Sequence, residues 1–122
     1  MEFNDTYVGT IVDTNDPIKI GRCRVMIDIL FEGIDKQNLP WAYPSYPNVF
    51  GKGGQSGSIS VPKEGSVFRV KYINGDIYQP IYECNQELAE DVKEELNNEY
   101  NGTHILLYDG DEGLKIYYTK GK

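Results

Sequence analysis

The sequence predicts an all-β protein: a small barrel of five short strands, followed by a short helix and a C-terminal pair of strands. Three observations support this prediction. The 122 residues include 13 Gly, 6 Pro and 10 Tyr, a composition that favours short strands separated by turns. Apolar and polar residues alternate with a period of two in several segments, and no apolar run is long. The 39% hydrophobic content suffices for one modest core.

Charge and cysteine content narrow the classes of function. The chain carries 19 acidic and 12 basic residues, and its net charge of −7 disfavours general binding to a phosphate backbone. The amino terminus lacks the basic and apolar regions of a secretory signal, and no segment has the roughly 20 apolar residues of a membrane span. We therefore expect a protein kept soluble in the cytosol, without stable membrane insertion. Cys23 and Cys84 lie inside predicted strands, where we expect both to be small buried hydrophobic residues.

A turn with specific backbone requirements joins the first two predicted strands, Thr6–Asp13 and Arg22–Leu30. In this turn Asp16 precedes Pro17, which fixes its own φ and restricts the residue before it, while Gly21 supplies conformational freedom. The second strand alternates with a period of two, and its predicted buried face consists of Cys23, Val25, Ile27 and Ile29.

The next segment combines prolines with aromatic residues. Within residues 39–47 three prolines exclude both a helix and a central strand, so we expect an extended crossing anchored by Trp41. The glycine-rich stretch 50–58 is not a phosphate-binding P-loop, because Lys52 comes too early for that motif. A strand, Ser58–Val61, is predicted after it where a P-loop would need a helix.

The strongest hairpin signal is Asn74-Gly75, since both residues tolerate the positive φ of a tight turn. This turn joins the predicted strands Ser66–Ile73 and Ile77–Cys84. Pro80 lies within the second of these strands, and because proline cannot donate a ladder hydrogen bond we expect it at a sheet edge or a bulge.

The periodicity changes from that of a strand to that of a helix after the hairpin. Residues 86–100 place apolar side chains four residues apart, which predicts an amphipathic helix with Asn85 as its N-cap. We interpret the acidic residues of this helix as a solvated face, because they do not follow the spacing of metal ligands. Two strands, His104–Tyr108 and Leu114–Thr119, are predicted to follow. Their connection, 109–113, lacks the remaining ligand positions of a calcium loop and is therefore interpreted as a hairpin turn.

Five short strands with one long irregular crossing are typical of a small closed barrel such as the OB-fold. The sequence thus divides into an OB-fold barrel (1–85), a helical linker (86–101) and a terminal strand pair (102–122). Two strands at a chain end bury little surface on their own, so we expect the terminal pair to find partners in other subunits.

Three motifs of the barrel agree in order and spacing with one known family. They are Tyr7–Asp13 with Asp16-Pro17 and Gly21-Arg22; Leu39-Pro40-Trp41-Ala42; and Gly65-Ser66-Val67 with Asn74-Gly75-Asp76 and Gln79-Pro80-Ile81. With these motifs the chain resembles the OB-fold domain shared by the central spike proteins of contractile phage tails and the VgrG spike of type VI secretion. The segment 102–116 is similar to the start of the intertwined trimeric β-needle of these spikes. The motif residues to which the resemblance gives structural roles are Asp16, Pro17, Gly21, Arg22, Trp41, Gly75 and Pro80.

The resemblance implies a structural protein of the virion, assembled in the cytoplasm of a host bacterium. It implies a homotrimer in the tail baseplate that joins a hub protein above to a spike needle or tip protein below, without cofactor or metal. Some relatives carry a lysozyme domain between barrel and needle, but residues 86–101 are too few to hold one, so we expect no enzyme. The candidate subunit-interface residues are apolar positions that a monomer would leave uncovered: Leu88, Val92, Leu96, Tyr100, Ile105, Leu107, Ile116 and Tyr118.

Two alternatives come from other classes of protein. An OB-fold can bind single-stranded nucleic acid through stacking rings and cations, which here would be Trp41, Tyr43, Tyr46, Arg22, Arg24, Arg69 and Lys71. The negative net charge argues against this alternative. An enzyme would need a nucleophile paired with a base, and no such pair can be assembled from the sequence. The single histidine, His104, lies at the start of a strand, where we assign it a structural role.

Overall fold

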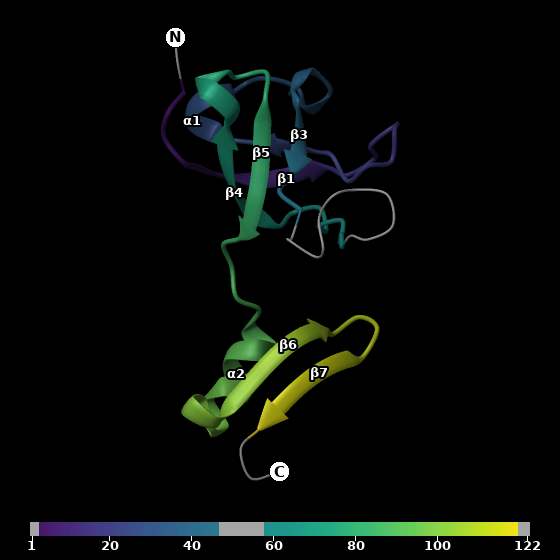
Figure 1. The fold of residues 1–122 in the computed structure, drawn as a ribbon, viewed down its shortest axis with the longest axis vertical. Helices are drawn as coiled ribbons and strands as arrows, with labels where there is room; N and C mark the ends of the chain where they lie inside the picture. Colours follow the sequence, from purple (N-terminus) through teal and green to yellow (C-terminus); the bar gives the residue numbers. More distant parts are fainter. Residues whose placement is uncertain (1–2, 47–57, 120–122) are drawn as a thin grey trace. The chain divides into compact units, whose positions relative to one another are not determined.

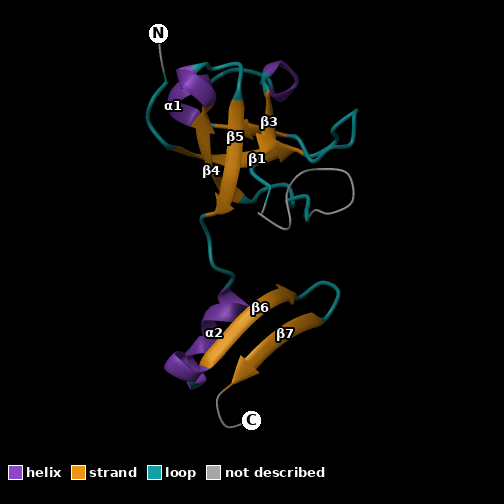
Figure 2. Ribbon diagram, in the orientation of Figure 1, coloured by secondary structure: helices purple, strands orange, loops and turns teal. Residues whose placement is uncertain are grey.

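The computed structural model describes residues 3–46 and 58–119. The chain divides into two compact units, Met1–Glu87 and Leu88–Lys122, which we call the barrel unit and the hairpin unit. Figure 1 shows strands wrapped into a barrel in the first unit and a helix beside two strands in the second. Figure 2 marks the same elements by type of secondary structure.

The barrel unit is a closed five-stranded barrel with the strand order β1-β2-β3-β5-β4. Its strands are β1 (Tyr7–Asp13), β2 (Cys23–Met26), β3 (Trp41–Pro44), β4 (Val67–Tyr72) and β5 (Pro80–Asn85). Neighbouring strands are antiparallel except β3 and β5, which run parallel. The predicted all-β fold with an OB-like barrel is therefore confirmed.

The first strand closes the barrel because it pairs on both sides. Its first half pairs with β4 from Tyr7 to Thr10, and its second half pairs with β2 from Thr10 to Asp13. Gly9 permits the close approach to β2, since a Cβ at this position would lie 2.6 Å from the side chain of Val25. A larger residue at position 9 would push the two strands apart.

The core lies inside the barrel and draws on every one of its strands. Its buried hydrophobic residues are Ile11, Cys23, Val25, Ile27, Phe31, Leu39, Ala42, Val70, Tyr72 and Tyr82. Cys23 is buried as predicted, but the same prediction for Cys84 is wrong, because Cys84 is exposed. The reason is a bulge: Glu83 and Cys84 of β5 both lie opposite Arg69 of β4, so the inside-outside alternation is broken there.

The predicted strand Arg22–Leu30 is only half correct, since β2 ends at Met26 and a single helical turn, α1 (Asp28–Phe31), follows. Ile29, predicted to be buried, is 82% exposed. In the helical turn Ile27 and Phe31 are four residues apart, so both reach the core, whereas a continued strand would have buried Ile29 instead of Phe31.

In and after the proline-rich region, the segments that form barrel strands also differ from the prediction. Trp41–Pro44, expected to be an extended crossing, is a barrel strand, while the predicted strand Ser58–Val61 lies in an irregular connection. Pro44 ends β3, and Pro40 precedes it, so neither proline interrupts the ladder. A short 3-10 helix, η1 (Lys36–Asn38), leads into β3. Most of the glycine-rich stretch 50–58 lies outside the described residues.

The tight turn at Asn74-Gly75 is confirmed, since both residues have positive φ and the Asp76 N–H donates to the Ile73 carbonyl. It belongs to a longer loop than predicted, which contains η2 (Ile73–Gly75) and reaches to Gln79. The prediction for Pro80 is wrong, because Pro80 lies at the first position of β5 and not at a sheet edge or a bulge. At this position its missing N–H does not remove a hydrogen bond from the middle of the strand.

The hairpin unit contains α2 (Glu90–Asn98), η3 (Tyr100–Gly102) and a two-stranded sheet of β6 (Thr103–Asp109) and β7 (Leu114–Thr119). The predicted hairpin is confirmed, and the helix is shorter than predicted. Asn85 is not its cap, because α2 begins after Ala89, and the Asn85 side chain instead accepts the N–H of Glu87. Within the described residues, no helix has the length and apolar character needed to cross a membrane.

Candidate functional site

A buried carboxylate organises the loop between β1 and β2. The side chain of Asp16 is only 3% exposed and accepts five hydrogen bonds. Three come from the backbone N–H groups of Ile18, Ile20 and Arg22, and two come from the Arg22 guanidinium, the shorter at 2.8 Å. Pro17 starts the turn that places these donors around one carboxylate, and Gly21, with φ of 87°, ends it.

The charges of this pair stabilise each other. The Arg22 guanidinium beside Asp16 holds the pKa of that carboxyl well below its usual range, although burial acts in the opposite direction. The three N–H donors of the loop lower it further. Asp16 in turn raises the pKa of Arg22. Asp16 therefore stays ionised across the physiological pH range and acts as a fixed structural anchor.

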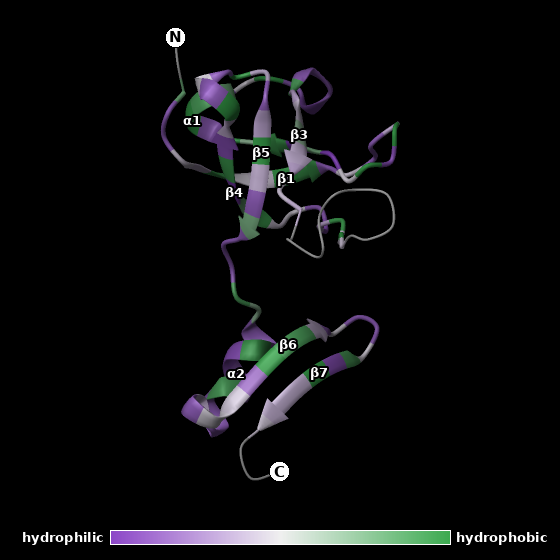
Figure 3. Cartoon of the chain, viewed as in Figure 1, coloured by the Kyte–Doolittle hydropathy of each residue, from purple (hydrophilic) through white to green (hydrophobic). Residues whose placement is uncertain are grey.

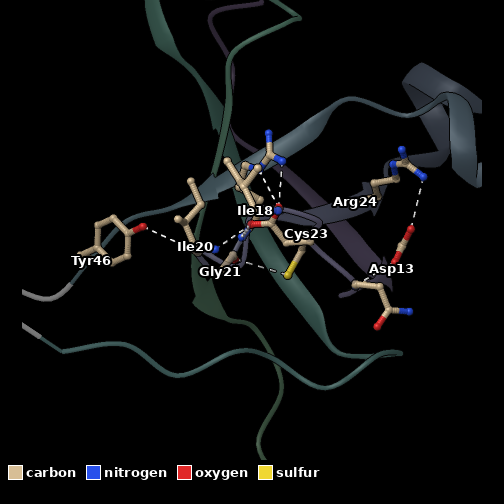
Figure 4. A network of polar contacts seen from close by, with 10 residues as sticks. Asp13, Ile18, Ile20, Gly21, Cys23, Arg24 and Tyr46 are labelled. Atoms are coloured by element: carbon tan, nitrogen blue, oxygen red, sulfur yellow. Dashed lines mark hydrogen bonds and ion pairs between the residues drawn. The ribbon is translucent and has the colours of Figure 1, made fainter.

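Two tyrosines fix the loop from the rest of the barrel. The hydroxyl of Tyr82, in the core, donates to the carbonyl of Gly21, and the hydroxyl of Tyr46 donates to the carbonyl of Ile20 at 2.8 Å. Figure 4 shows Tyr46 approaching Ile20 from one side and the Cys23 thiol beside Gly21. Burial raises the pKa of both Tyr82 and Cys23, so both remain protonated near neutral pH. The loop is thus ordered by the barrel itself.

Cations and rings share the outer face of β2 and β3. The Arg24 guanidinium lies 4.3 Å above the Trp41 ring, and Arg22 lies 5.3 Å from Trp41 and 5.7 Å from Tyr43. Both arginines are also ion-paired, Arg22 with Asp16 and Arg24 with Asp13 at 3.2 Å (Figure 4). This arrangement positions the rings and neutralises the cations at the same time.

The other two cations considered for nucleic-acid binding share one acidic partner. Arg69 and Lys71 lie on adjacent outward positions of β4, at 3.7 and 3.5 Å from the Glu83 carboxylate. Each of the four cations therefore has a carboxylate neighbour. Tyr46, the third aromatic residue of that hypothesis, follows β3 and donates its hydroxyl to the β1–β2 loop.

The remaining motif residues have structural positions. Gly75, with φ of 71°, occupies the tight turn between β4 and β5, and its carbonyl accepts the N–H of Phe3. His104 stacks on Tyr118 across the hairpin at 5.9 Å. No group of three or more His, Cys, Asp or Glu within residues 3–46 and 58–119 is arranged to hold a metal ion.

The hairpin unit has one covered face and one uncovered face. Ile105, Tyr108 and Lys115 lie on the face toward α2, where Tyr108 donates to Asp91 at 2.7 Å and Lys115 pairs with Glu95 at 3.0 Å. The opposite face, which we call the hairpin face, carries His104 and four apolar side chains that are each 47–57% exposed: Leu107, Leu114, Ile116 and Tyr118. Because Leu106 forms a bulge, Leu107 lies on the hairpin face and not on the same face as Ile105. Figure 3 shows hydrophobic and hydrophilic positions alternating at the start of β7, next to the turn.

The structure brings together three of the eight predicted interface residues on the hairpin face: Leu107, Ile116 and Tyr118. Ile105 lies on the opposite face, and Val92 and Leu96 are half-buried positions of α2. Leu88 and Tyr100 lie outside α2 and are exposed.

Some features of these surfaces were missed by sequence reasoning. Leu114 could have been included, because it continues the period of two from Ile116 and Tyr118. No pattern indicated the shallow cavity of about 430 Å³ beside β3 and the β4–β5 loop, which is lined by Tyr43, Ile73, Tyr78, Gln79 and Pro80.

Comparison with known proteins does not assign the chain to a family. No family model matches the chain, and no curated protein matches it.

Proposed function

We propose that this protein is a structural component of a contractile tail baseplate, a homotrimer that joins a hub protein to the needle or tip of the central spike. In this proposal the barrels lie beneath the tail-tube hub and the C-terminal strands assemble about the threefold axis. The motifs of residues 7–81 support the family, and the OB-like barrel is compatible with it. The proposed role is mechanical and includes no catalytic step.

One observation carries the proposal of assembly: the described part of the hairpin unit, residues 88–119, has no internal core. None of the described hydrophobic residues in 88–119 is buried, although β6 and β7 carry several large apolar side chains. A two-stranded sheet with one helix is marginal in water, and an exposed apolar face of this kind marks a contact surface. Among the described residues β6 and β7 pair only with each other, so each strand leaves one open edge.

A second copy of the chain is the occupant that covers all of these features. When the β6 edge of one copy meets the β7 edge of the next, the contact is head-to-tail, and such contacts close into a ring when the rotation permits. Three copies then turn their hairpin faces toward a common axis, where Leu107, Leu114, Ile116 and Tyr118 form a shared core.

The test is the mass of the full chain with and without charge on the hairpin face. We expect the wild-type chain to be a trimer in native mass spectrometry, and Ile116→Asp with Tyr118→Asp to be a monomer with a folded barrel. The matched control is Ile29→Asp with Tyr78→Asp, which places the same substitutions on barrel residues that are each 82% exposed. We expect the control to remain trimeric, and a wild-type monomer at micromolar concentration would contradict the proposal.

A second candidate function is the binding of single-stranded nucleic acid. The stack of Arg24 on Trp41 favours it, because OB-folds use the outer face of strands 2 and 3 for oligonucleotides. The carboxylates of Asp13, Asp16 and Glu83 weaken it, since they lower the attraction of the neighbouring cations for phosphate. A salt-sensitive mobility shift of labelled single-stranded DNA would support this candidate, and no binding at low salt would remove it.

A further inference from the structure

The barrel unit carries its own apolar surface at the β1–β2 loop. Ile18, Ile20, Tyr46 and Ile59, which we call the loop patch, are each 36–56% exposed. Tyr46 reaches the loop through the carbonyl of Ile20. Ile59 lies against Gly21, where an added Cβ would be 2.5 Å from its Cδ1 atom. Two loops far apart in the sequence thus supply one patch.

The loop patch is held rigidly before any partner arrives. The N–H groups of Ile18 and Ile20 both donate to the Asp16 carboxylate, at 3.0 and 2.9 Å. Lys19 between them has φ of 57°, a left-handed conformation that a non-glycine residue adopts only when its surroundings hold it there. Figure 4 shows Ile18 and Ile20 within this network. A surface ordered by the fold loses little conformational entropy on binding.

The hairpin face alone offers less area than each partner buries in a stable interface. Strands of seven and six residues are roughly 20 Å long, and a pair of them is about 10 Å wide, so the face offers roughly 200 Å² per copy. Protruding side chains add surface to this flat area, but even twice its value stays well below the roughly 800 Å² that each partner buries in a stable interface. A contact on the barrel as well would bring the buried area closer to that of a stable interface.

We propose that the loop patch is that second contact, buried against the barrel of a neighbouring copy. The inference rests on the proposed trimer and adds a surface to it. In a ring of three the patch meets a different surface of the next copy. Lys19, exposed between the two isoleucines, favours an acidic rim on the neighbouring copy, and the chain carries 19 acidic residues against 12 basic ones. A face-to-face contact of two patches would instead bring two Lys19 ammonium groups together.

The test measures trimer dissociation of the full chain on dilution, by analytical ultracentrifugation. We expect Ile18→Asp with Ile20→Asp to raise the concentration at which the trimer dissociates by roughly tenfold or more. Ile29→Asp, an exposed isoleucine outside the patch, is the matched control and should dissociate as wild type does. Lys19→Glu should weaken the trimer by a smaller factor that shrinks in high salt. Far-ultraviolet circular dichroism checks that each variant keeps a folded barrel.

The two proposals fail in distinguishable ways. If the patch variants dissociate as wild type does while Ile116→Asp with Tyr118→Asp abolishes the trimer, the second contact is wrong and the hairpin contact stands. The same result would mean that the loop patch does not contact another copy of this chain. If the wild-type chain is a monomer, both proposals are overturned.

Discussion

The barrel unit and the hairpin unit are folded by the same chain in different ways. In the barrel, ten described hydrophobic side chains are buried, with Ile11, Val70 and Cys23 almost wholly removed from water. In the hairpin unit no described hydrophobic side chain is buried, and the only described residues that are buried there are Gly102 and Thr103. The barrel encloses a core because five strands close on themselves, whereas two strands and a short helix can cover only one face.

The difference teaches where each unit obtains its stability. The barrel holds its apolar side chains against one another, so its folding depends on a single chain. The hairpin unit leaves an alternating apolar row, Leu114, Ile116 and Tyr118, available to other copies. Its stability should therefore depend on protein concentration, and the following predictions test this contrast in order of decreasing effect.

Truncating matched isoleucines in the two units should give the largest contrast. We expect Ile11→Ala to lower the free energy of unfolding of the barrel by about 3 kcal/mol, because it opens a cavity in a closed core. Ile116→Ala should change stability by about 0.5 kcal/mol or less in dilute monomer and by more in the trimer. Urea unfolding at two protein concentrations measures both. Equal costs at all concentrations would break the contrast.

The Asp16 anchor should stabilise the barrel without affecting the hairpin unit. We expect Asp16→Asn to lower the Tm of the barrel by roughly 10 °C at pH 7, since the Arg22 guanidinium loses the negative charge that it pairs with. The pKa of Asp16 is held below its ordinary value of 3.8, so its contribution is present above that pH and lost as the pH falls below it. Thermal melts of both proteins between pH 2 and 7 should therefore converge at the acid end. A constant difference would argue against the ionised anchor.

Tyr72 should make the barrel sensitive to alkali. Burial raises the pKa of Tyr72 to about 12 from an ordinary value of 10, so the stability it contributes is present below pH 10 and lost as the pH rises toward 12. We expect a loss of about 2 kcal/mol across this range. Tyr72→Phe should remove that part of the pH dependence and stay close to wild type at pH 7. Unfolding curves from pH 9 to 12 that are parallel for the two proteins would contradict this.

The ion pair between Lys115 and Glu95 should have the smallest effect. Both side chains are partly exposed, at 26% and 43%, so we expect Lys115→Met to cost about 0.5 kcal/mol and less in high salt. Lys93→Met, which removes the more exposed pair with Glu90, is the control and should cost less still. Hydrogen exchange of the hairpin amides measures both variants. A cost above that of Ile11→Ala would mean that polar contacts, not apolar burial, hold this unit.

Most of the fold follows from local patterns in the sequence. The alternation of β1, β4, β6 and β7 predicted these strands within one or two residues, and Asn74-Gly75 predicted its turn. The errors arose where tertiary contacts decide: Phe31 reaches the core through a helical turn that displaces Ile29, and prolines at the ends of β3 do not prevent pairing. The bulge at Cys84 depends on the register of two distant strands, which no local pattern reports.

The surfaces were predictable to a lesser degree. Sequence periodicity found Ile116 and Tyr118. A period of two also grouped Ile105 with Leu107, but the bulge at Leu106 places these two residues on opposite faces of β6. The five hydrogen bonds of Asp16 could not be predicted from the sequence either, since they depend on how the loop folds around one carboxylate.

Hydrogen exchange of the full chain at two protein concentrations tests the central contrast most directly. Amides of β6 and β7 should be protected at high concentration and should exchange much faster after dilution, while amides of β1 and β4 keep the same protection. Protection of the hairpin that is strong and independent of concentration would contradict the account, because it would show that this unit is stable within a single chain.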